Sequence, residues 1–288
     1  MSILKISCPH RGHLSLITFC LLSVWSPLSA QTGKELMADA CYNELHQRER
    51  NALWESQVER RTADHVFLEE EIETVEGPVH RLISVDGHEP SPSERKQNDD
   101  RLRDLMQNPK TRFAAKKNHE ADEEKFGELL RVLPNIFLYE DQGNHGSIEK
   151  LTFHPNPAFA PKTYEEIALH AMSGFVLINL DEKRIASFSG TLTQQVDFGF
   201  GVVGQLKKGG TLEVNRIRLS PGMWKTNSSK IDINGRIVFF KTISKQQDET
   251  YREFKPVAPG TTIPQALQQI GGRWGGLSEP IQGISQAP

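Results

Sequence analysis

Residues 173–251 alternate apolar and polar side chains in the two-residue period of β-strands over most of their length. Val176 and Ile178 fall on one face of a first expected strand, and Ala186 and Phe188 fall on one face of a second, because side chains two residues apart share a face. Short turn sequences separate these strands. The stretch therefore predicts an antiparallel β-meander, and this constrains the fold more than any other feature of the chain.

Three turn sequences mark the expected ends of the later strands. Residues 207–210 read Lys-Lys-Gly-Gly, and residues 220–222 read Ser-Pro-Gly. Asn234 and Gly235 form the strongest short hairpin signal, because both residue types accept the positive φ that a two-residue turn needs. We therefore expect a hairpin at Asn234 and Gly235, with a further strand through residues 237–240.

The first thirty residues have the order of a secretory signal. Lys5 and Arg11 precede an apolar stretch, residues 14–25, which leads into small residues ending at Ala30. The apolar stretch is too short for a membrane span of about 20 residues, and no later segment replaces it. We expect a signal peptide over residues 1–30, cleavage after Ala30, a periplasmic or extracellular location and no transmembrane segment in the mature chain.

Cysteine usage and charge exclude several classes of protein. Cys8 and Cys20 leave with the signal, so Cys41 remains alone and no internal disulfide is expected. The position of Cys41 indicates a free or helix-buried thiol rather than a lipid anchor. The formal net charge of −3 is not that of a nucleic-acid binder. The histidines form no His-Glu-x-x-His pair, so the sequence predicts neither a metal nor a cofactor.

The chain before the meander is expected to hold helices and two hairpins. Helix formers over residues 34–60 predict an N-terminal helix, and residues 65–74 and 80–85 predict two hairpin strands. The segment 94–131 is crowded with charge, and Ser91 or Ser93 can cap a helix at its start, with a break near Pro109. We expect a solvated helical insertion there.

The segments on either side of the meander complete the expected organisation. Residues 134–140 and 148–154 read as strands, and Thr163 with Glu166 forms a capping box for a short helix over 164–172. Proline and glycine pairs after residue 256 predict a flexible C-terminal tail, residues 257–288. Residues 31–256 are therefore expected to form one domain.

Two motifs admit a chemical interpretation. Gly199, Gly201 and Gly204 spell the dinucleotide fingerprint, but a strand and a turn follow, with no helix start to hold a phosphate. Four glutamates at positions 69, 70, 71 and 73 can hold a cation or act as acid and base in a cleft. Residues 248–251 are equally polar, and a solvated sheet face explains both groups.

Several pieces, taken in chain order, carry a resemblance. They are the strand of residues 59–74, the hairpin return ending in Val85-Asp86-Gly87 and followed by Pro90-Ser91-Pro92-Ser93-Glu94, the charged insertion, the strand of residues 134–139, residues 153–161, and the meander of residues 174–251 with Phe198-Gly199 and Trp224. Together they cover residues 58–255. By this pattern the chain resembles a group of exported bacterial proteins of unassigned function that are related to the LolA and LolB type of outer-membrane lipoprotein carriers.

The resemblance implies an α+β fold in which a strongly curved antiparallel sheet, a half-barrel, wraps helices. It also implies an apolar cavity that holds acyl chains. We expect Phe188, Phe200, Trp224 and Phe239 to line that cavity, although a filled core explains the same residues. The leading hypothesis is a non-enzymatic envelope protein that binds a lipid, acylated or other apolar ligand. The alternatives are an interaction or scaffold protein with an envelope protein partner, and a hydrolase that uses the strand carboxylates.

Overall fold

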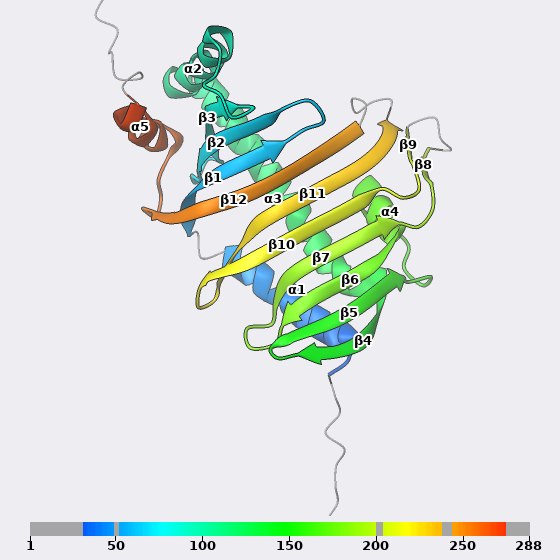
Figure 1. Cartoon of the computed structure of the whole chain (residues 1–288). Helices are drawn as coiled ribbons and strands as arrows, with labels where there is room; N and C mark the ends of the chain where they lie inside the picture. The colour runs from blue at the N-terminus through cyan, green and yellow to red at the C-terminus, as the bar shows by residue number, and fades with distance from the viewer. Residues whose placement is uncertain (1–30, 49–51, 200–203, 238–243, 275–288) are drawn as a thin grey trace, which may run out of the picture. The chain divides into compact units, whose positions relative to one another are not determined.

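One open antiparallel sheet carries the fold (Figure 1). The computed structural model describes residues 31–48, 52–199, 204–237 and 244–274, and the helices and strands within these ranges belong to one unit, residues 32–288. The strands are β1 (Leu53–Arg61), β2 (Val66–Ile72), β3 (Val79–Val85), β4 (Phe137–His145), β5 (Ile148–Pro155), β6 (Met172–Asn179), β7 (Arg184–Leu192), β8 (Val196–Phe198), β9 (Gly204–Leu206), β10 (Thr211–Ser220), β11 (Met223–Ile237) and β12 (Ser244–Val257). The helices are α1 (Gly33–Arg48), α2 (Pro92–Gln107), α3 (Pro109–Ile136), α4 (Tyr164–His170) and α5 (Ile263–Trp274).

The strands pair in the order β3-β2-β1-β12-β11-β10-β7-β6-β5-β4, and β8 and β9 form a small extension that joins the sheet through β11. The pairings among these strands are antiparallel. Because β3 and β4 lie at opposite ends of this order, the sheet is not closed into a barrel. The expected α+β class with an antiparallel meander is confirmed.

Strand β1 corrects the expected N-terminal helix. A helix over residues 34–60 is wrong beyond residue 48, because Leu53–Arg61 is a strand between β2 and β12. Val58 lies opposite Glu69 of β2 and opposite Tyr251 of β12. Ordinary residues differ in helix propensity by at most about 0.7 kcal/mol each. Pairing with strands on both sides outweighs such differences, so this segment is a strand.

The hairpin turn expected at Asn234 and Gly235 is also wrong, since both residues lie inside the continuous strand β11. The strand pairs with β12 as far as Asn234, and its last three residues pair with β9. A Cβ atom on Gly235 would come within 2.5 Å of the backbone oxygen of Gln205. The glycine therefore permits the close approach of β9 rather than a turn.

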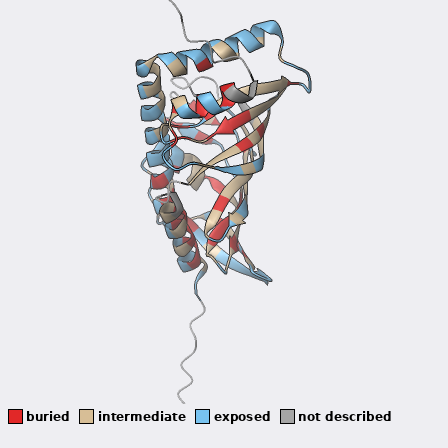
Figure 2. Cartoon of the chain, turned by 90° about the vertical axis from the view of Figure 1, so that its left-hand side faces the viewer, coloured by how far each residue is buried: buried red, intermediate tan, exposed pale blue. Residues whose placement is uncertain are grey.

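Helices α1 and α3 pack together and against one face of the sheet, called the helix face below (Figure 2). The buried positions of α1 follow helical spacing, with Leu36 and Met37 one turn before Ala40 and Cys41. The large core contains Leu36, Met37, Ala40, Cys41, Leu130, Leu133, Ile136, Phe137, Leu151, Phe153, Ala171, Met172, Val176, Ile178, Ile185, Phe188, Leu192, Val196, Phe198 and Leu206. It joins the two helices to strands β4 to β9.

The N-terminal signals of α2 and α3 are confirmed. The hydroxyl of Ser91 accepts the backbone N–H of Glu94, and the Glu94 carboxylate accepts the backbone N–H of Ser91. Asn108 ends α2 and caps α3, whose first residue is Pro109. The charged insertion therefore consists of two helices with a break at the predicted place.

The strand expected over residues 134–140 begins later than predicted. Helix α3 continues to Ile136 with Pro134 inside its last turn, and β4 begins at Phe137. Proline costs an intrahelical hydrogen bond, but Leu130, Leu133 and Ile136 are buried in the large core. Their burial keeps this end of α3 helical. The other expected elements are present as β2, β3, β5 and α4.

Part of the expected flexible tail, residues 257–288, is folded instead, because Ile263–Trp274 forms helix α5. Its buried residues Ile263, Ala266, Leu267 and Ile270 recur at the spacing of one helix face. They form a second core with Ile72, Val79 and Leu102, against which Leu105, Met106, Ala115 and Val257 pack. The helix therefore belongs to the folded unit, and residues 275–288 lie outside the described residues.

Several expectations fall on positions that the structure does not describe. The signal segment, residues 1–30, lies outside the described residues, as do Phe200 and Phe239. Cys41 is buried on α1, and burial raises the pKa of its thiol to about 12. Within the described residues, the helices lack the length and apolar character that a membrane crossing needs.

Candidate functional site

The structure places the two described aromatic site residues apart from each other. Phe188 is 9% exposed and stacks on Phe153 in the large core, with 4.9 Å between the ring centroids. Trp224 is 6% exposed, and its Nε1 donates to Oε2 of Glu182 at 2.7 Å. Neither residue lines either of the two cavities described below. That Phe188 and Trp224 line an apolar cavity remains a prediction.

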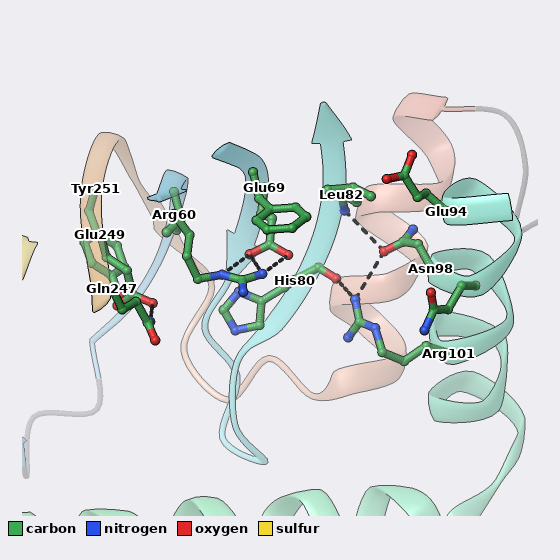
Figure 3. A pocket seen from close by; sticks show the side chains of 13 residues that line it. Arg60, Glu69, His80, Leu82, Glu94, Asn98, Arg101, Gln247, Glu249 and Tyr251 are labelled. Atoms are coloured by element: carbon green, nitrogen blue, oxygen red, sulfur yellow. Dashed lines mark hydrogen bonds and ion pairs between the residues drawn. The ribbon is translucent and has the colours of Figure 1, made fainter. Parts of the chain in front are cut away.

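A cleft of about 560 Å³ lies on the helix face between α2 and the strands β1, β2, β3 and β12 (Figure 3). Its lining residues are Val58, Arg60, Phe67, Glu69, His80, Leu82, Glu94, Gln97, Asn98, Arg101, Gln247, Glu249 and Tyr251. Small-molecule sites typically enclose about 300–1,000 Å³. The cleft is therefore large enough for a ligand, and its wall mixes apolar, aromatic and charged side chains.

Strand register explains why these residues share one wall. Val58 lies opposite both Glu69 and Tyr251, and Glu69 lies opposite Leu82. Directly paired residues of antiparallel strands point to the same side of the sheet. Three consecutive strands, β1 to β3, and the distant strand β12 therefore present their side chains to one cleft.

Arg60 and Glu69 form a cross-strand ion pair on the cleft wall. Nη2 of Arg60 lies 3.0 Å from each carboxylate oxygen of Glu69. The Arg60 guanidinium also lies 4.9 Å from the centre of the Phe67 ring. The Glu69 charge is thus balanced within the protein, and both side chains are held in place.

Strand β12 supplies a hydrogen-bonded group around Glu249. The Tyr251 hydroxyl donates to Oε2 of Glu249 at 2.9 Å, and the Ser229 hydroxyl donates to the same atom at 3.4 Å. The side-chain amide of Gln247 donates to the other oxygen. Burial, followed by the charge of Glu249, raises the pKa of Tyr251 well above its usual value. Tyr251 therefore remains a hydrogen-bond donor.

Helix α2 forms the opposite wall of the cleft. Oδ1 of Asn98 accepts the backbone N–H of Leu82 at 3.2 Å and Nη2 of Arg101 at 3.2 Å. The same nitrogen of Arg101 also donates to the backbone oxygen of His80. Partial burial of the guanidinium lowers the pKa of Arg101. These contacts fix α2 against β3 and hold a guanidinium at the cleft.

Glu71 and His80 form a neutral pair beside the cleft. Glu71 is 9% exposed, and burial raises its pKa to about 8, with the charge of Glu73 acting in the same direction. Its Oε2 lies 3.4 Å from Nδ1 of His80. Burial lowers the pKa of His80. At neutral pH Glu71 is therefore mostly protonated and His80 is uncharged.

Sequence reasoning found part of this site and misjudged its surroundings. It noted the glutamates of β2 and the polar end of β12 but assigned both to a solvated face, which is wrong for the buried Glu70 and Glu71. It also did not identify the residues of α2 that line the cleft. The available signal was a polar stripe at helical spacing, made of Glu94, Gln97, Asn98 and Arg101.

The sheet also carries a second, smaller cavity. The second cavity, of about 220 Å³, is lined by Glu55, Ser56, Gln57, Glu70, Ile83, Glu253 and Lys255. Within the described ranges, no three His, Cys, Asp or Glu side chains are grouped so that they could hold a metal ion. The larger cleft is therefore the candidate site.

Comparisons of this chain with protein-family models, curated proteins and solved structures found no match. The fold and the site define an α+β protein with an open antiparallel sheet and a mixed polar and apolar cleft.

Proposed function

We propose that the chain is a non-enzymatic exported envelope protein that binds a ligand with an apolar part. The ligand occupies the cleft between α2 and strands β1, β2, β3 and β12. The assignment to a LolA-like half-barrel belongs to the same proposal, because an open sheet with helices against one face is compatible with it.

The observation that carries the proposal is the composition of the cleft wall. Phe67 and Leu82 offer apolar surface within a volume of about 560 Å³, and the buried Val58 also lines it. Polar side chains from β12 and α2 stand around them. Binding sites for small ligands combine these features, with apolar contacts for affinity and a few polar groups for orientation.

The alternative is an envelope interaction or scaffold protein without a ligand. The packing of Phe188 against Phe153 favours it, because this part of the helix face is occupied by the protein's own core. The two functions differ in one measurable property, which is saturable binding of a small apolar molecule.

A fluorescent fatty-acid probe tests the proposal. We expect saturable binding by the parent protein and a loss of at least about tenfold in affinity for Leu82→Glu, since a carboxylate would be buried against the apolar part of the ligand. Leu138→Glu is the matched control, because Leu138 lies on the strand at the other end of the sheet and is 43% exposed. This variant should bind like the parent.

Both variants must first unfold cooperatively, so that lost binding reports on the cleft. Absence of saturable binding by the parent would favour the interaction protein instead. Export has a separate test: N-terminal sequencing of protein from the envelope fraction should begin at or near Gln31. An intact Met1 on that protein would contradict export.

A further inference from the structure

Arg101 has an unusual electrostatic position in the cleft. Its Nη2 donates to two neutral oxygens, Oδ1 of Asn98 and the backbone oxygen of His80. No carboxylate among the described residues forms an ion pair with it, and Glu69 acts on it only at longer range. Arg101 is exposed, and a guanidinium without a carboxylate partner keeps donors that water fills until a ligand replaces it.

The other charged side chains of the cleft have partners within the protein. Glu69 is bonded to Arg60 through both oxygens. Glu94 completes the capping box with Ser91. Glu249, on the opposite wall, accepts hydrogen bonds from Gln247, Tyr251 and Ser229. The donors to Glu94 and Glu249 are neutral groups, so these two carboxylates keep their charge. Of the two guanidinium groups that line the cleft, Arg60 is paired with a carboxylate and Arg101 is not, so Arg101 is the cation that can pair with a ligand.

Apolar surface lies beside this guanidinium. Leu82 belongs to the strand that Arg101 contacts through His80, and Phe67 lines the same cleft. We infer that the ligand is a small amphipathic anion, with a carboxylate or phosphate group on Arg101 and a short apolar chain along Phe67 and Leu82. This inference rests on the proposed binding function and names the chemical class of the ligand.

The chemistry of arginine supports an oxyanion in this place. A guanidinium presents planar, paired donors that match the oxygens of carboxylates and phosphates. A ligand that displaces water from the cleft strengthens the attraction between this charge and its own anion. A neutral head group of the same size would leave the Arg101 charge unbalanced, so the cleft should distinguish head groups by charge.

Displacement of the fluorescent probe by four ten-carbon ligands tests the inference. Decanoate and decyl phosphate carry the anion, decanol carries a neutral head group, and decylamine carries a positive charge. The parent should bind at least one of the two anions about tenfold or more tighter than decanol, and decylamine should bind more weakly than decanol. The tighter anion distinguishes a carboxylate site from a phosphate site.

Substitutions on α2 test whether Arg101 causes the preference for an anion over decanol. Arg101→Gln should reduce the difference between anion and alcohol to within about twofold, and Arg101→Lys should keep part of it because the charge remains. Arg103→Gln is the matched control on the same helix, since Arg103 is exposed like Arg101 but does not line the cleft and is paired with Asp100 at 2.8 Å. Its preference should equal that of the parent. Cooperative melting of each variant confirms that it folds.

The outcomes separate this inference from the proposed function. Equal binding of decanol and both anions would overturn the anion inference while leaving a ligand-binding protein in place. An unchanged preference in Arg101→Gln would also overturn it, because another group would then hold the anion. If neither the probe nor any of the four ligands binds, both the proposed function and this inference are contradicted.

Discussion

Oε2 of Glu71 lies 3.4 Å from Nδ1 of His80, at directly paired positions of β2 and β3. Burial raises the pKa of Glu71 to about 8. The other charged groups that act on Glu71 are Glu69, Glu73, Lys225 and Glu249. Three of these four are carboxylates, so the surroundings favour the neutral form of Glu71.

The raised pKa of Glu71 predicts a loss of stability with rising pH. Below pH 4.5 the carboxyl is protonated in both the folded and the unfolded chain. Between pH 4.5 and about 8 the unfolded chain loses this proton and the folded protein keeps it. The free energy of unfolding should therefore fall by about 1.4 kcal/mol per pH unit from this group and level off above that range.

Glu71→Gln should lack this contribution, because glutamine is neutral in both states. Urea unfolding at pH 5, 6, 7 and 8 should show the variant gaining stability over the parent at each step. Glu94→Gln is the control from the same cleft. Hydrogen bonds from Ser91 lower the pKa of Glu94, so the stability that ionised Glu94 contributes is lost only as pH falls below 4.5. Between pH 5 and 8 the profile of Glu94→Gln should therefore run parallel to that of the parent. Parallel profiles for the parent and Glu71→Gln would contradict a protonated Glu71.

Several local signals in the sequence predicted the local structure correctly, although the turn expected at Asn234 and Gly235 was wrong. The serine cap before residue 94 and the break near Pro109 depend on residues within one or two helical turns, and both are present, with Ser91 as the cap. The antiparallel meander also followed from side-chain alternation. Each of these features depends on neighbours in the sequence, and that is why pattern reasoning found them.

The candidate site depends on pairings that the sequence does not reveal. Val58 reaches the cleft only because β1 pairs with β12, from the far end of the chain. Glu71, paired with Ser56 of β1 and His80 of β3, is buried beside the cleft whose other wall is α2. The polarity of a strand does not tell whether a helix will cover it. A polar face was therefore predicted to be solvated where the structure buries it.

The second prediction concerns a buried cluster of ion pairs that joins α1 to the sheet. Nη2 of Arg184 lies 2.7 Å from Oε2 of Glu44, and Arg216 contacts the other oxygen. The Glu44 side chain is 8% exposed and that of Arg184 is 5% exposed. Glu44→Gln should lower the free energy of unfolding by about 3–5 kcal/mol, because it removes the carboxylate charge that both the buried Arg184 and the partly buried Arg216 contact.

An exposed ion pair between the same two elements provides the comparison. Lys183 and Asp39 also join the start of β7 to α1, but their side chains are 42% and 44% exposed. Asp39→Asn should cost at most about 1 kcal/mol, since water screens the pair. Urea denaturation of both variants at neutral pH measures the difference. Equal losses in the free energy of unfolding would mean that the buried ion pairs of Glu44 stabilise the fold no more than the exposed pair does.

The third prediction concerns α5, in the segment expected to be flexible. Leu267 is fully buried in the second core, while its neighbour Gln268 is exposed. Leu267→Ala should cost about 2–5 kcal/mol, as large-to-small changes in a packed core do. Gln268→Ala should change the stability by at most about 0.5 kcal/mol. A melting temperature of Leu267→Ala equal to that of the parent would mean that α5 does not dock in solution.

The last prediction uses two glycines that face each other in the sheet. Gly174 of β6 pairs directly with Gly190 of β7. A Cβ on Gly174 would lie 1.9 Å from the backbone oxygen of Ser189, and backbone in a sheet cannot move aside without breaking its ladder. A Cβ on Gly190 would meet Sδ of Met172 at 3.2 Å, and a methionine side chain can adjust.

The two alanine variants should therefore differ although they occupy one register position. Gly174→Ala should lose about 1–3 kcal/mol, the usual cost of overpacking, or fail to fold. Gly190→Ala should stay within about 1 kcal/mol of the parent, because the lower entropy of the unfolded alanine chain offsets a small adjustment of Met172. Thermal and urea unfolding of the two variants side by side measure this. Equal stabilities, or a greater loss at Gly190, would show that β6 and β7 are not paired in this register.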